Sequence, residues 1–169
     1  MDTAELAALY DAHASALFAF LLNLTRQEAE ALDVLQETFL KLARQPELLR
    51  EVREPRGFLI RLAHNLAIDR LRRHESRRRR HEALAPEASA IFAPAEDPDA
   101  QAFREALEAA LGELPAEQRA VVHLRLWEDM TFEGIGALLG IPMNTAASRY
   151  RYGLDKLRER LRPVYDEIR

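Results

Sequence analysis

Four side chains in the C-terminal third of the chain have the right chemistry to read the edges of DNA bases: Ala147, Ser148, Arg151 and Tyr152. Arginine can donate two hydrogen bonds to guanine, serine can donate or accept one, and small or aromatic groups can contact a thymine methyl group. Nearby polar and cationic groups can hold phosphates, which fixes position without reading sequence. The residues predicted to bind DNA here are Asn144, Thr145, Ala147, Ser148, Arg149, Arg151 and Tyr152.

Two amphipathic helices joined by a tight turn, within residues 131–161, are predicted to position these side chains. Thr131 suits the N-cap of the first helix, and Gly140 can take the left-handed conformation that ends it. The second helix begins near Asn144, and its apolar residues recur at helical spacing: Ala146, Tyr150, Leu154, Leu157 and Leu161. The pattern is typical of a helix-turn-helix. A helical hairpin with a solvated outer face has the same spacing, but the basic second helix favours DNA binding.

An earlier helix, ending near residue 44, is predicted to present acidic and polar side chains to solvent. Leu32, Leu35, Phe39 and Leu42 form its expected buried face. The outer face holds Asp33, Gln36, Glu37 and Lys41. Such a face either binds a basic partner or is simply solvated, and the residues alone favour solvation.

A third helix is predicted to begin at Pro55, because proline suits the first turn of a helix. It is mostly apolar as far as Leu71 but carries a polar stripe that leads into a cluster in which seven of the eleven residues 70–80 are arginine. We interpret this stripe as a second nucleic-acid face, with a solvated helix end as the alternative. The residues predicted to contact DNA on it are Arg61, Asn65, Asp69, Arg72, Arg73 and Arg77.

Composition excludes several other functions. The chain has 169 residues, 48% of them hydrophobic and 31% charged, which fits one or two compact globular domains. It has no cysteine, and its 5 histidines lack paired metal-ligand spacing, so we expect no metal site. We find no nucleophile pair, carboxylate cluster or phosphate-cradling loop, and therefore expect no catalytic residue and no cofactor. The longest apolar run, residues 16–22, is too short to cross a bilayer, so we expect a cytoplasmic protein without membrane insertion.

Helical patterns occur throughout and no strand pattern does, so the predicted fold class is all-α. Residues 82–100 are rich in alanine, proline and acid, which indicates a flexible acidic linker. The predicted organisation is a domain at 1–81, a linker at 82–100 and a second domain at 101–169. The net charge of −4 conceals separate basic and acidic segments, so we expect weak DNA binding by the isolated protein.

Three segments in this order resemble the sigma-70 family of bacterial RNA polymerase sigma factors, in its two-domain extracytoplasmic-function (ECF) class. DVLQETFLKL, at 33–42, is similar to the polymerase-binding helix of that family. PRGFLIRLAHNLAIDRLRR, at 55–73, resembles its −10 promoter segment, and residues 114–161 resemble its −35-binding domain.

The resemblance implies two small helical domains, sigma region 2 and sigma region 4, and a protein that directs promoter-specific transcription initiation. It implies that Asp33, Gln36, Glu37 and Lys41 meet the β′ clamp helices of core polymerase, whose β subunit is a further partner. It also implies that the helix around Asn65 captures a −10 base and that the second helix of the helix-turn-helix reads the −35 element. Promoter DNA and an anti-sigma factor are the other expected partners.

The sequence departs from the family pattern at several positions. Gly134 and Gly136 replace the usual glutamate and alanine, and Phe58 replaces a common tryptophan. Ala147 replaces a usual lysine or arginine, and Tyr152-Gly153 replaces a frequent Arg-Ala pair. These differences predict an altered −35 preference on an unchanged fold. The rival hypotheses are a free-standing helix-turn-helix repressor or activator that dimerises, and an enzyme that acts on nucleic acid.

Overall fold

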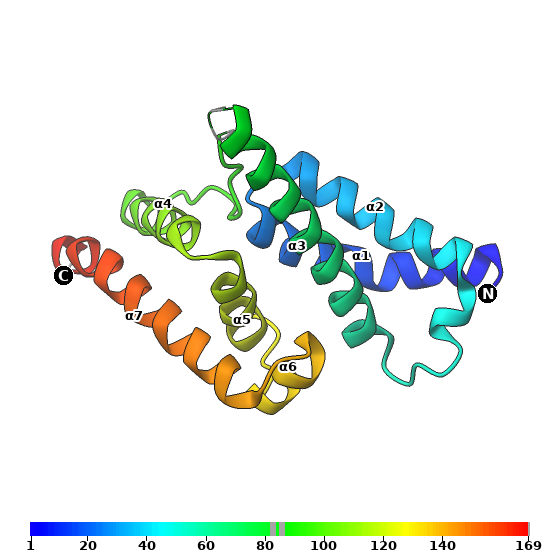
Figure 1. Ribbon diagram of the computed structural model, residues 1–169. Coiled ribbons are helices and arrows are strands. Elements are labelled where there is room, and N and C mark those ends of the chain that lie inside the picture. The colour runs from blue at the N-terminus through cyan, green and yellow to red at the C-terminus, as the bar shows by residue number, and fades with distance from the viewer. Residues whose placement is uncertain (82–83, 85–86, 169) are drawn as a thin grey trace. The chain divides into compact units, whose positions relative to one another are not determined.

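The computed structural model describes residues 1–81, 84 and 87–168, and every regular element in these residues is a helix (Figure 1). The predicted all-α class is confirmed. The chain divides into two compact units, Met1–Ser89 and Ala90–Arg169. In chain order the elements are α1 (Thr3–Thr25), α2 (Glu28–Arg44), the 3₁₀ helix η1 (Pro46–Leu49), α3 (Pro55–His81), α4 (Pro98–Glu113), α5 (Ala116–Leu126), α6 (Phe132–Leu139) and α7 (Met143–Ile168).

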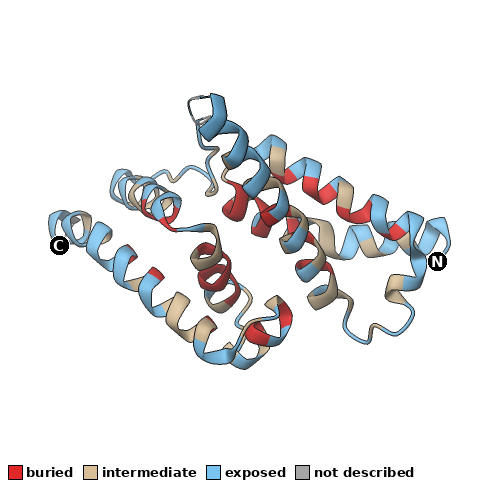
Figure 2. Ribbon diagram, viewed as in Figure 1, coloured by how far each residue is buried: buried red, intermediate tan, exposed pale blue. Residues whose placement is uncertain are grey.

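In the first unit α1, α2 and α3 pack against one another around one hydrophobic core (Figure 1). The fully buried large side chains of this core are Leu17, Phe20, Leu21, Leu24, Val34, Leu42 and Leu59. Pro55 occupies the first turn of α3, as its fixed φ angle predicts. The three helices thereby leave the remaining face of α2 and one face of α3 to solvent (Figure 2).

The prediction that Leu32 lies on the buried face of α2 was wrong. Its side chain is 43% exposed, whereas Ala31, Val34 and Thr38 are buried. The buried face is centred near Ala31 and Leu42, and because a helix turns by about 100° per residue, Leu32 lies on its margin. Ala31 is fully buried, and the buried Thr38 hydroxyl donates to the Val34 carbonyl at 2.7 Å.

By length and composition alone, α1 is long and apolar enough to cross a membrane. The apolar run at 16–22, on which the sequence analysis relied, is shorter and did not indicate this. The core helix of a soluble protein passes the same test, so this is weak evidence. Here the C-terminal half of α1 supplies Leu17, Phe20, Leu21 and Leu24 to the core of the first unit. Packing therefore accounts for the apolar residues in the C-terminal half of α1.

In the second unit α7 contacts each of the other three helices, and α5 is the most deeply buried (Figure 2). The core of the second unit contains Ala110, Leu111, Leu114, Val122 and Leu157, with Tyr150, Leu154 and Leu161 of α7 packed against it. This agrees with the apolar face predicted for α7.

A buried arginine closes the end of α4. Arg119 is 7% exposed, and its Nη1 donates to the carbonyls of Leu114 at 2.8 Å and Gly112 at 3.3 Å. The last carbonyls of a helix lack intrahelical donors, and a cation is also favoured there by the helix dipole. Arg119 therefore joins the end of α4 to α5.

The residues predicted as a linker, 82–100, are shared between the two units, and 82–83 and 85–86 lie outside the described residues. On the first unit, the Ser89 hydroxyl accepts a hydrogen bond from the Glu28 backbone N–H at 3.0 Å. The backbone N–H of Ser89 donates to the Arg26 carbonyl at 2.8 Å. Gln27, the N-cap residue of α2, makes no side-chain cap of its own. Ser89 therefore caps α2 from a distant part of the sequence.

On the second unit, the same segment is held by α4. One carboxylate oxygen of Glu108 accepts from the backbone N–H groups of Ile91 at 2.9 Å and Phe92 at 2.7 Å. Arg104 donates to the Ala93 carbonyl, and the side chains of Ile91 and Phe92 pack on the hydrophobic core. The C-terminal half of the linker is thus part of the folded second unit.

Ser89→Ala should weaken the start of α2, because it removes the acceptor of the Glu28 N–H. Loss of a helix cap costs about 0.5–2 kcal/mol, so the Glu28 amide should exchange with solvent about two- to thirtyfold faster. Amide hydrogen exchange followed by NMR measures this directly. Ser15→Ala, at an exposed position of α1, is the control and should leave Glu28 unchanged. Unaltered exchange in Ser89→Ala would show that this cap adds nothing.

Candidate functional site: the exposed faces of α2, α3 and α7

The exposed face of α2 carries the residues predicted to bind a basic partner. Gln36 and Lys41 are exposed, and the side chains of Asp33 and Glu37 are 58% and 45% exposed. Leu40, also on the exposed side, is 53% exposed. The predicted residues therefore share one accessible surface that includes apolar area.

The acidic groups of this face are bound within the protein by Arg70 of α3. Its Nε lies 3.1 Å from Glu30, its Nη2 lies 3.1 Å from Asp33, and its Nη1 lies 3.3 Å from Glu37. We name this cluster of Glu30, Asp33, Glu37 and Arg70 the acid–Arg70 cluster. The Arg70 guanidinium contacts both Asp33 and Glu37, two like charges one helical turn apart that would otherwise repel each other.

Two opposing effects act on the Arg70 guanidinium. Burial lowers its pKa, but the hydrogen bond and charge of Glu30, the hydrogen bond to Glu37 and the charge of Asp33 outweigh burial and raise the pKa above its ordinary value. Arg70 therefore stays charged. One positive charge facing three carboxylates leaves this part of α2 with a net negative charge.

The polar stripe predicted on α3 lies on the solvent side of that helix. Arg61, Asn65, Asp69 and Arg72 are all exposed. The Arg61 guanidinium lies over the ring of Phe58, 5.8 Å from its centroid, which fixes its direction. The stripe is exposed to solvent along the N-terminal two-thirds of α3.

The arginine cluster at the end of α3 separates into residues with different surroundings. Glu75 pairs with Arg78 at 2.5 Å and with Arg79 at 2.9 Å, so these two positive charges are partly neutralised. Arg73 and Arg77 instead line a hollow of about 180 Å³ together with Arg70 and His74. We name this hollow, lined by Arg70, Arg73, His74 and Arg77, the basic hollow. Arg73 also donates to the Asp69 backbone carbonyl at 3.3 Å.

The predicted helix-turn-helix is formed by α6, the turn at 140–142 and α7. The Thr131 hydroxyl accepts from the Gly134 N–H at 3.0 Å, and Gly140 has a φ angle of 68°, as their residue types predicted. A Cβ atom at Gly136 would lie 2.8 Å from the Ile141 carbonyl oxygen and 3.3 Å from the Met143 nitrogen. The turn therefore passes directly over Gly136, and only glycine fits there without movement.

The second glycine of structural importance, Gly153, follows the α7 residues that were predicted to bind DNA. A Cβ atom at Gly153 would lie 2.8 Å from Cγ2 of Val122. Gly153 therefore lets α7 approach α5 closely, and this approach sets how far the preceding residues project. Above α6, the rings of Phe132 and Tyr150 lie 5.3 Å apart and the Arg125 guanidinium lies 5.3 Å from Phe132.

The residues predicted to bind DNA on α7 lie together on its first three turns. Asn144, Arg151 and Tyr152 are exposed, and Thr145, Ala147, Ser148 and Arg149 are half-buried. The Arg151 guanidinium lies over the Tyr152 ring, 5.2 Å from its centroid. Farther along α7, Arg160 pairs with Glu113 at 2.7 Å and Arg158 with Asp155 at 3.5 Å. The cations of this distal part are partly engaged within the unit.

Sequence analysis missed the roles of Glu30 and Arg70. A signal was present, because Arg70 continues the buried spacing of Ala63 and Ala67 on α3. A charged residue on a buried stripe is usually paired, so an acidic partner on a neighbouring helix could have been sought. Ser89 carried no comparable signal, because its contact with α2 joins distant parts of the chain.

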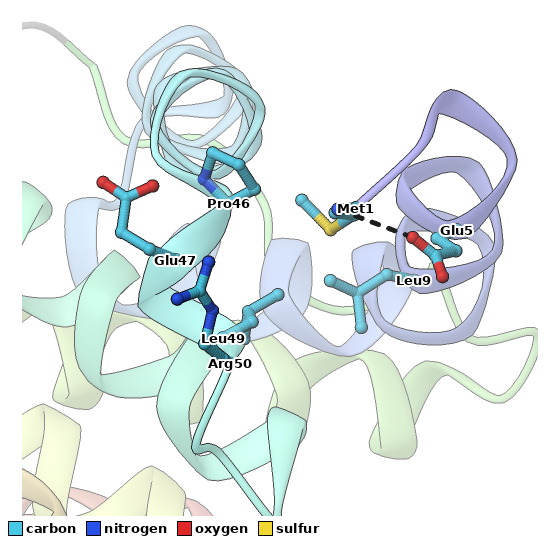
Figure 3. Close-up of a pocket in the computed structure, with 7 residues that line it drawn as sticks. All are labelled: Met1, Glu5, Leu9, Pro46, Glu47, Leu49 and Arg50. Atoms are coloured by element: carbon cyan, nitrogen blue, oxygen red, sulfur yellow. Dashed lines mark ion pairs between the residues drawn. The ribbon is translucent and has the colours of Figure 1, made fainter.

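A separate hollow of about 490 Å³ lies between the start of α1 and η1 (Figure 3). It is lined by Met1, Glu5, Leu9, Pro46, Glu47, Leu49 and Arg50. Its one ion pair joins the Met1 amino group to Glu5 at 3.7 Å, and the hollow contains no predicted site residue. Among the described residues, no three metal-ligating side chains come together as a metal ion requires. We assign no ligand to this hollow.

Comparison with known proteins identifies both units. The family description "Sigma-70 region 2" matches residues 9–77, and "Sigma-70, region 4" matches residues 110–159. The ECF RNA polymerase sigma factor SigL of Mycobacterium tuberculosis is 33% identical over 161 residues, covering 93% of this chain and 89% of SigL. The RNA polymerase sigma factor CarQ of Myxococcus xanthus is 36% identical over 162 residues, covering 95% of this chain and 91% of CarQ.

A solved structure has the same fold. It is the sigma factor RpoE of Bartonella quintana, in complex with the anti-sigma factor NepR. The TM-score is 0.73 at 24% identity, with 94% of each chain covered. At this identity the likeness concerns the fold.

Gly136→Ala should destabilise the second unit, because the added methyl group collides with the backbone of the turn. Overpacking of this kind costs about 1–3 kcal/mol, which exceeds or cancels the gain of about 1 kcal/mol in helix propensity. Urea unfolding followed by the fluorescence of Trp127, the only tryptophan, measures this unit.

Gly134→Ala is the matched control. A Cβ atom there would face only side-chain atoms, Thr131 Oγ1 at 3.2 Å and the Met130 methyl group at 3.6 Å. The Thr131 hydroxyl must shift by a few tenths of an ångström, which a side chain can do more readily than the turn backbone over Gly136. Gly134→Ala should therefore be the more stable of the two variants, and equal stability of both would contradict the close approach at Gly136.

Proposed function

This chain belongs to the ECF class of RNA polymerase sigma factors, and on that premise we propose that it binds core polymerase through the exposed face of α2 and reads promoter DNA with α3 and α7. The family directs promoter-specific initiation of transcription and is not a family of enzymes. The observation that carries the proposal is the position of Asp33, Gln36 and Glu37. They face outward from α2 while the opposite side of this helix fills the core.

The chemistry of the α2 face suits a basic, partly apolar protein surface. Its net negative charge attracts cations, and charge complementarity speeds and orients the encounter of two proteins. Leu40, exposed beside Lys41, offers apolar area that a protein partner could bury. We assign this face to the clamp helices of the polymerase β′ subunit, with the β subunit as a further contact.

The exposed face of α3 is suited to the −10 element. Capture of a displaced base requires groups that hydrogen-bond its edge and cations that follow the backbone. Asn65 provides an amide, and Arg61 and Arg72 on the same exposed stripe provide positive charge. Arg73 and Arg77 would contact phosphates from the basic hollow.

The face of α7 is suited to the −35 element, because its polar residues project from the start of the second helix of the helix-turn-helix. Arg151 supplies the group best able to read guanine, and the Tyr152 ring supports it. Ala147 lacks the charge of the usual lysine or arginine and leaves that phosphate contact unmade.

An anti-sigma factor is the regulatory partner that we propose for this protein. The structurally similar RpoE was solved bound to the anti-sigma factor NepR. We propose that an inhibitor of this kind restrains the present protein in the cytoplasm, where core polymerase acts. Membership of this family also outweighs the rival hypotheses of an autonomous repressor and of a nucleic-acid enzyme.

Replacing Asp33 with Asn and Glu37 with Gln should weaken binding to core polymerase by about thirtyfold or more, because truncating charge contacts at an interface costs about 2 kcal/mol or more. Amide side chains keep the shape and place no new cation beside Arg70. Titration of fluorescently labelled protein with core polymerase measures the affinity, and run-off transcription measures the consequence.

The control exchanges Glu47 and Glu51, two exposed acids beyond α2, for Gln. It makes the same change in net charge and should retain nearly full affinity. An equal loss in both variants would indicate a general charge effect, and undiminished binding in the first would remove α2 from the interface.

Arg151→Ala should relax the preference at one −35 position, because a bidentate contact to guanine is worth about 1–3 kcal/mol of discrimination. Tyr152→Phe should be nearly silent, since the ring remains. Tyr152→Ala should relax the same position in part, because it removes the surface beneath the Arg151 guanidinium.

Selection of −35 sequences from a randomised library by each holoenzyme would distinguish these outcomes. Ala147→Lys is the counterpart, because it adds a phosphate contact and should tighten binding without a change in preference. An unchanged preference in Arg151→Ala would assign base reading to another residue.

A further inference from the structure

Arg70 belongs to two surfaces of opposite charge. Its guanidinium is bound by three carboxylates in the acid–Arg70 cluster, and the same side chain lines the basic hollow with Arg73, His74 and Arg77. The first surface is the proposed polymerase-binding face, and the second is part of the proposed DNA-binding face. Each nitrogen of the guanidinium already faces a carboxylate, so Arg70 can turn fully toward a phosphate only by giving up some of these contacts.

We propose that Arg70 is an exchangeable cation that opposes polymerase binding at α2 and, once displaced from the carboxylates, contacts the phosphate backbone of DNA at the basic hollow. The proposal rests on the proposed function of α2 and α3. It makes Arg70 a further DNA-binding residue of this protein, one that is occupied internally until a cationic partner takes its place.

The geometry allows this exchange because the cluster is held by contacts that solvent can reach. The side chain of Arg70 is 27% exposed, and those of Glu30, Asp33 and Glu37 are 25%, 58% and 45% exposed. Ion pairs this accessible are individually weak, since water and salt compete for both partners. The two most exposed carboxylates, Asp33 and Glu37, are also the two proposed to face polymerase.

His74 adds a second connection between the same surfaces. Its Nε2 lies 3.7 Å from the second oxygen of Glu30, and its ring lines the basic hollow. Glu30 thus contacts both Arg70 and His74 and is the least exposed of the three acids. Glu30 can keep the base of the cluster in place while Asp33 and Glu37 change partners.

A coupling of this kind must act in both directions, because the effect of one ligand on another is thermodynamically reciprocal. A cation from polymerase that binds Asp33 and Glu37 releases Arg70 toward DNA. A phosphate that binds Arg70 equally exposes the carboxylates to polymerase. The free protein should therefore bind DNA less well than its arginine content suggests.

The first test uses the free full-length protein and a fluorescent 20-nucleotide single strand. A variant with Glu30→Gln, Asp33→Asn and Glu37→Gln should bind this strand about two- to tenfold more tightly than a control variant with Asp11→Asn, Glu47→Gln and Glu51→Gln, which makes the same charge change at exposed positions elsewhere in the unit. For the first variant, the slope of the logarithm of the binding constant against the logarithm of salt concentration should steepen by about 0.7, as one extra phosphate contact requires.

Both sets of substitutions are then repeated with Arg70→Gln. The advantage of the first set over the control should disappear, because the cation it releases is gone. The proposal would be overturned if the cluster variant bound DNA more tightly than the control variant even in the Arg70→Gln background. It would also be overturned if the two variants bound DNA equally well with Arg70 present. Circular dichroism and urea unfolding confirm that each variant is folded. Arg70→Lys, whose ammonium cannot span three carboxylates, should give affinities between those of the Arg70 and Arg70→Gln proteins for both DNA and polymerase.

The second test measures core polymerase affinity of the Arg70→Gln protein with its acids intact. Removal of the internal competitor should raise affinity about two- to fivefold. A loss of affinity would overturn the proposal, because Arg70 would then be holding the carboxylates in position for polymerase. The assignment of α2 to polymerase can fail while the exchange of Arg70 stands. This is the case if the Asp33→Asn, Glu37→Gln variant binds core polymerase normally but the oligonucleotide affinities change as expected.

Discussion

α2 and α7 each fill a hydrophobic core with one face and leave the opposite face, which we propose binds a partner, exposed to solvent. This constraint determines much of the structure. Ala31 on the inner face of α2 is fully buried, and Gly153 on α7 lets α5 pack closely. Close packing is what makes the outer face of each helix rigid, and a rigid face keeps its side chains in register with a partner.

Charge on the first unit is arranged under the same constraint. α2 and α3 pack against each other, so an acidic face on one and a basic face on the other meet along their shared edge. The acid–Arg70 cluster occupies this edge and lowers the repulsion within each face. The consequence is that neither face is independent of the other, because both draw on the same guanidinium.

Sequence reasoning recovered the helices and the turn because their signals are local. Thr131, Gly140 and Pro55 each act within one or two turns of chain, and the apolar spacing of α7 is periodic. It misplaced Leu32, because periodicity alone gives the centre of a buried face only to within about one residue. It did not find the partners of Arg70 or the cap from Ser89, because those contacts join residues far apart in the chain. The assignment of site residues on α2 to polymerase, and on α3 and α7 to DNA, stays a prediction.

The segment between the two units contributes to folding as well as to spacing. Ser89 completes the N-terminus of α2, and only two residues later Ile91 and Phe92 bond to Glu108 and pack on the core of the second unit. A helix end without its cap and a core without Phe92 would each cost stability, so this part of the chain is under two separate structural demands. Glu87 is held on the same unit as Ser89, because its carbonyl accepts a hydrogen bond from the Gln27 side chain. An insertion within residues 87–89 or 91–93 would therefore have to break a contact that one of the two units needs for its own fold.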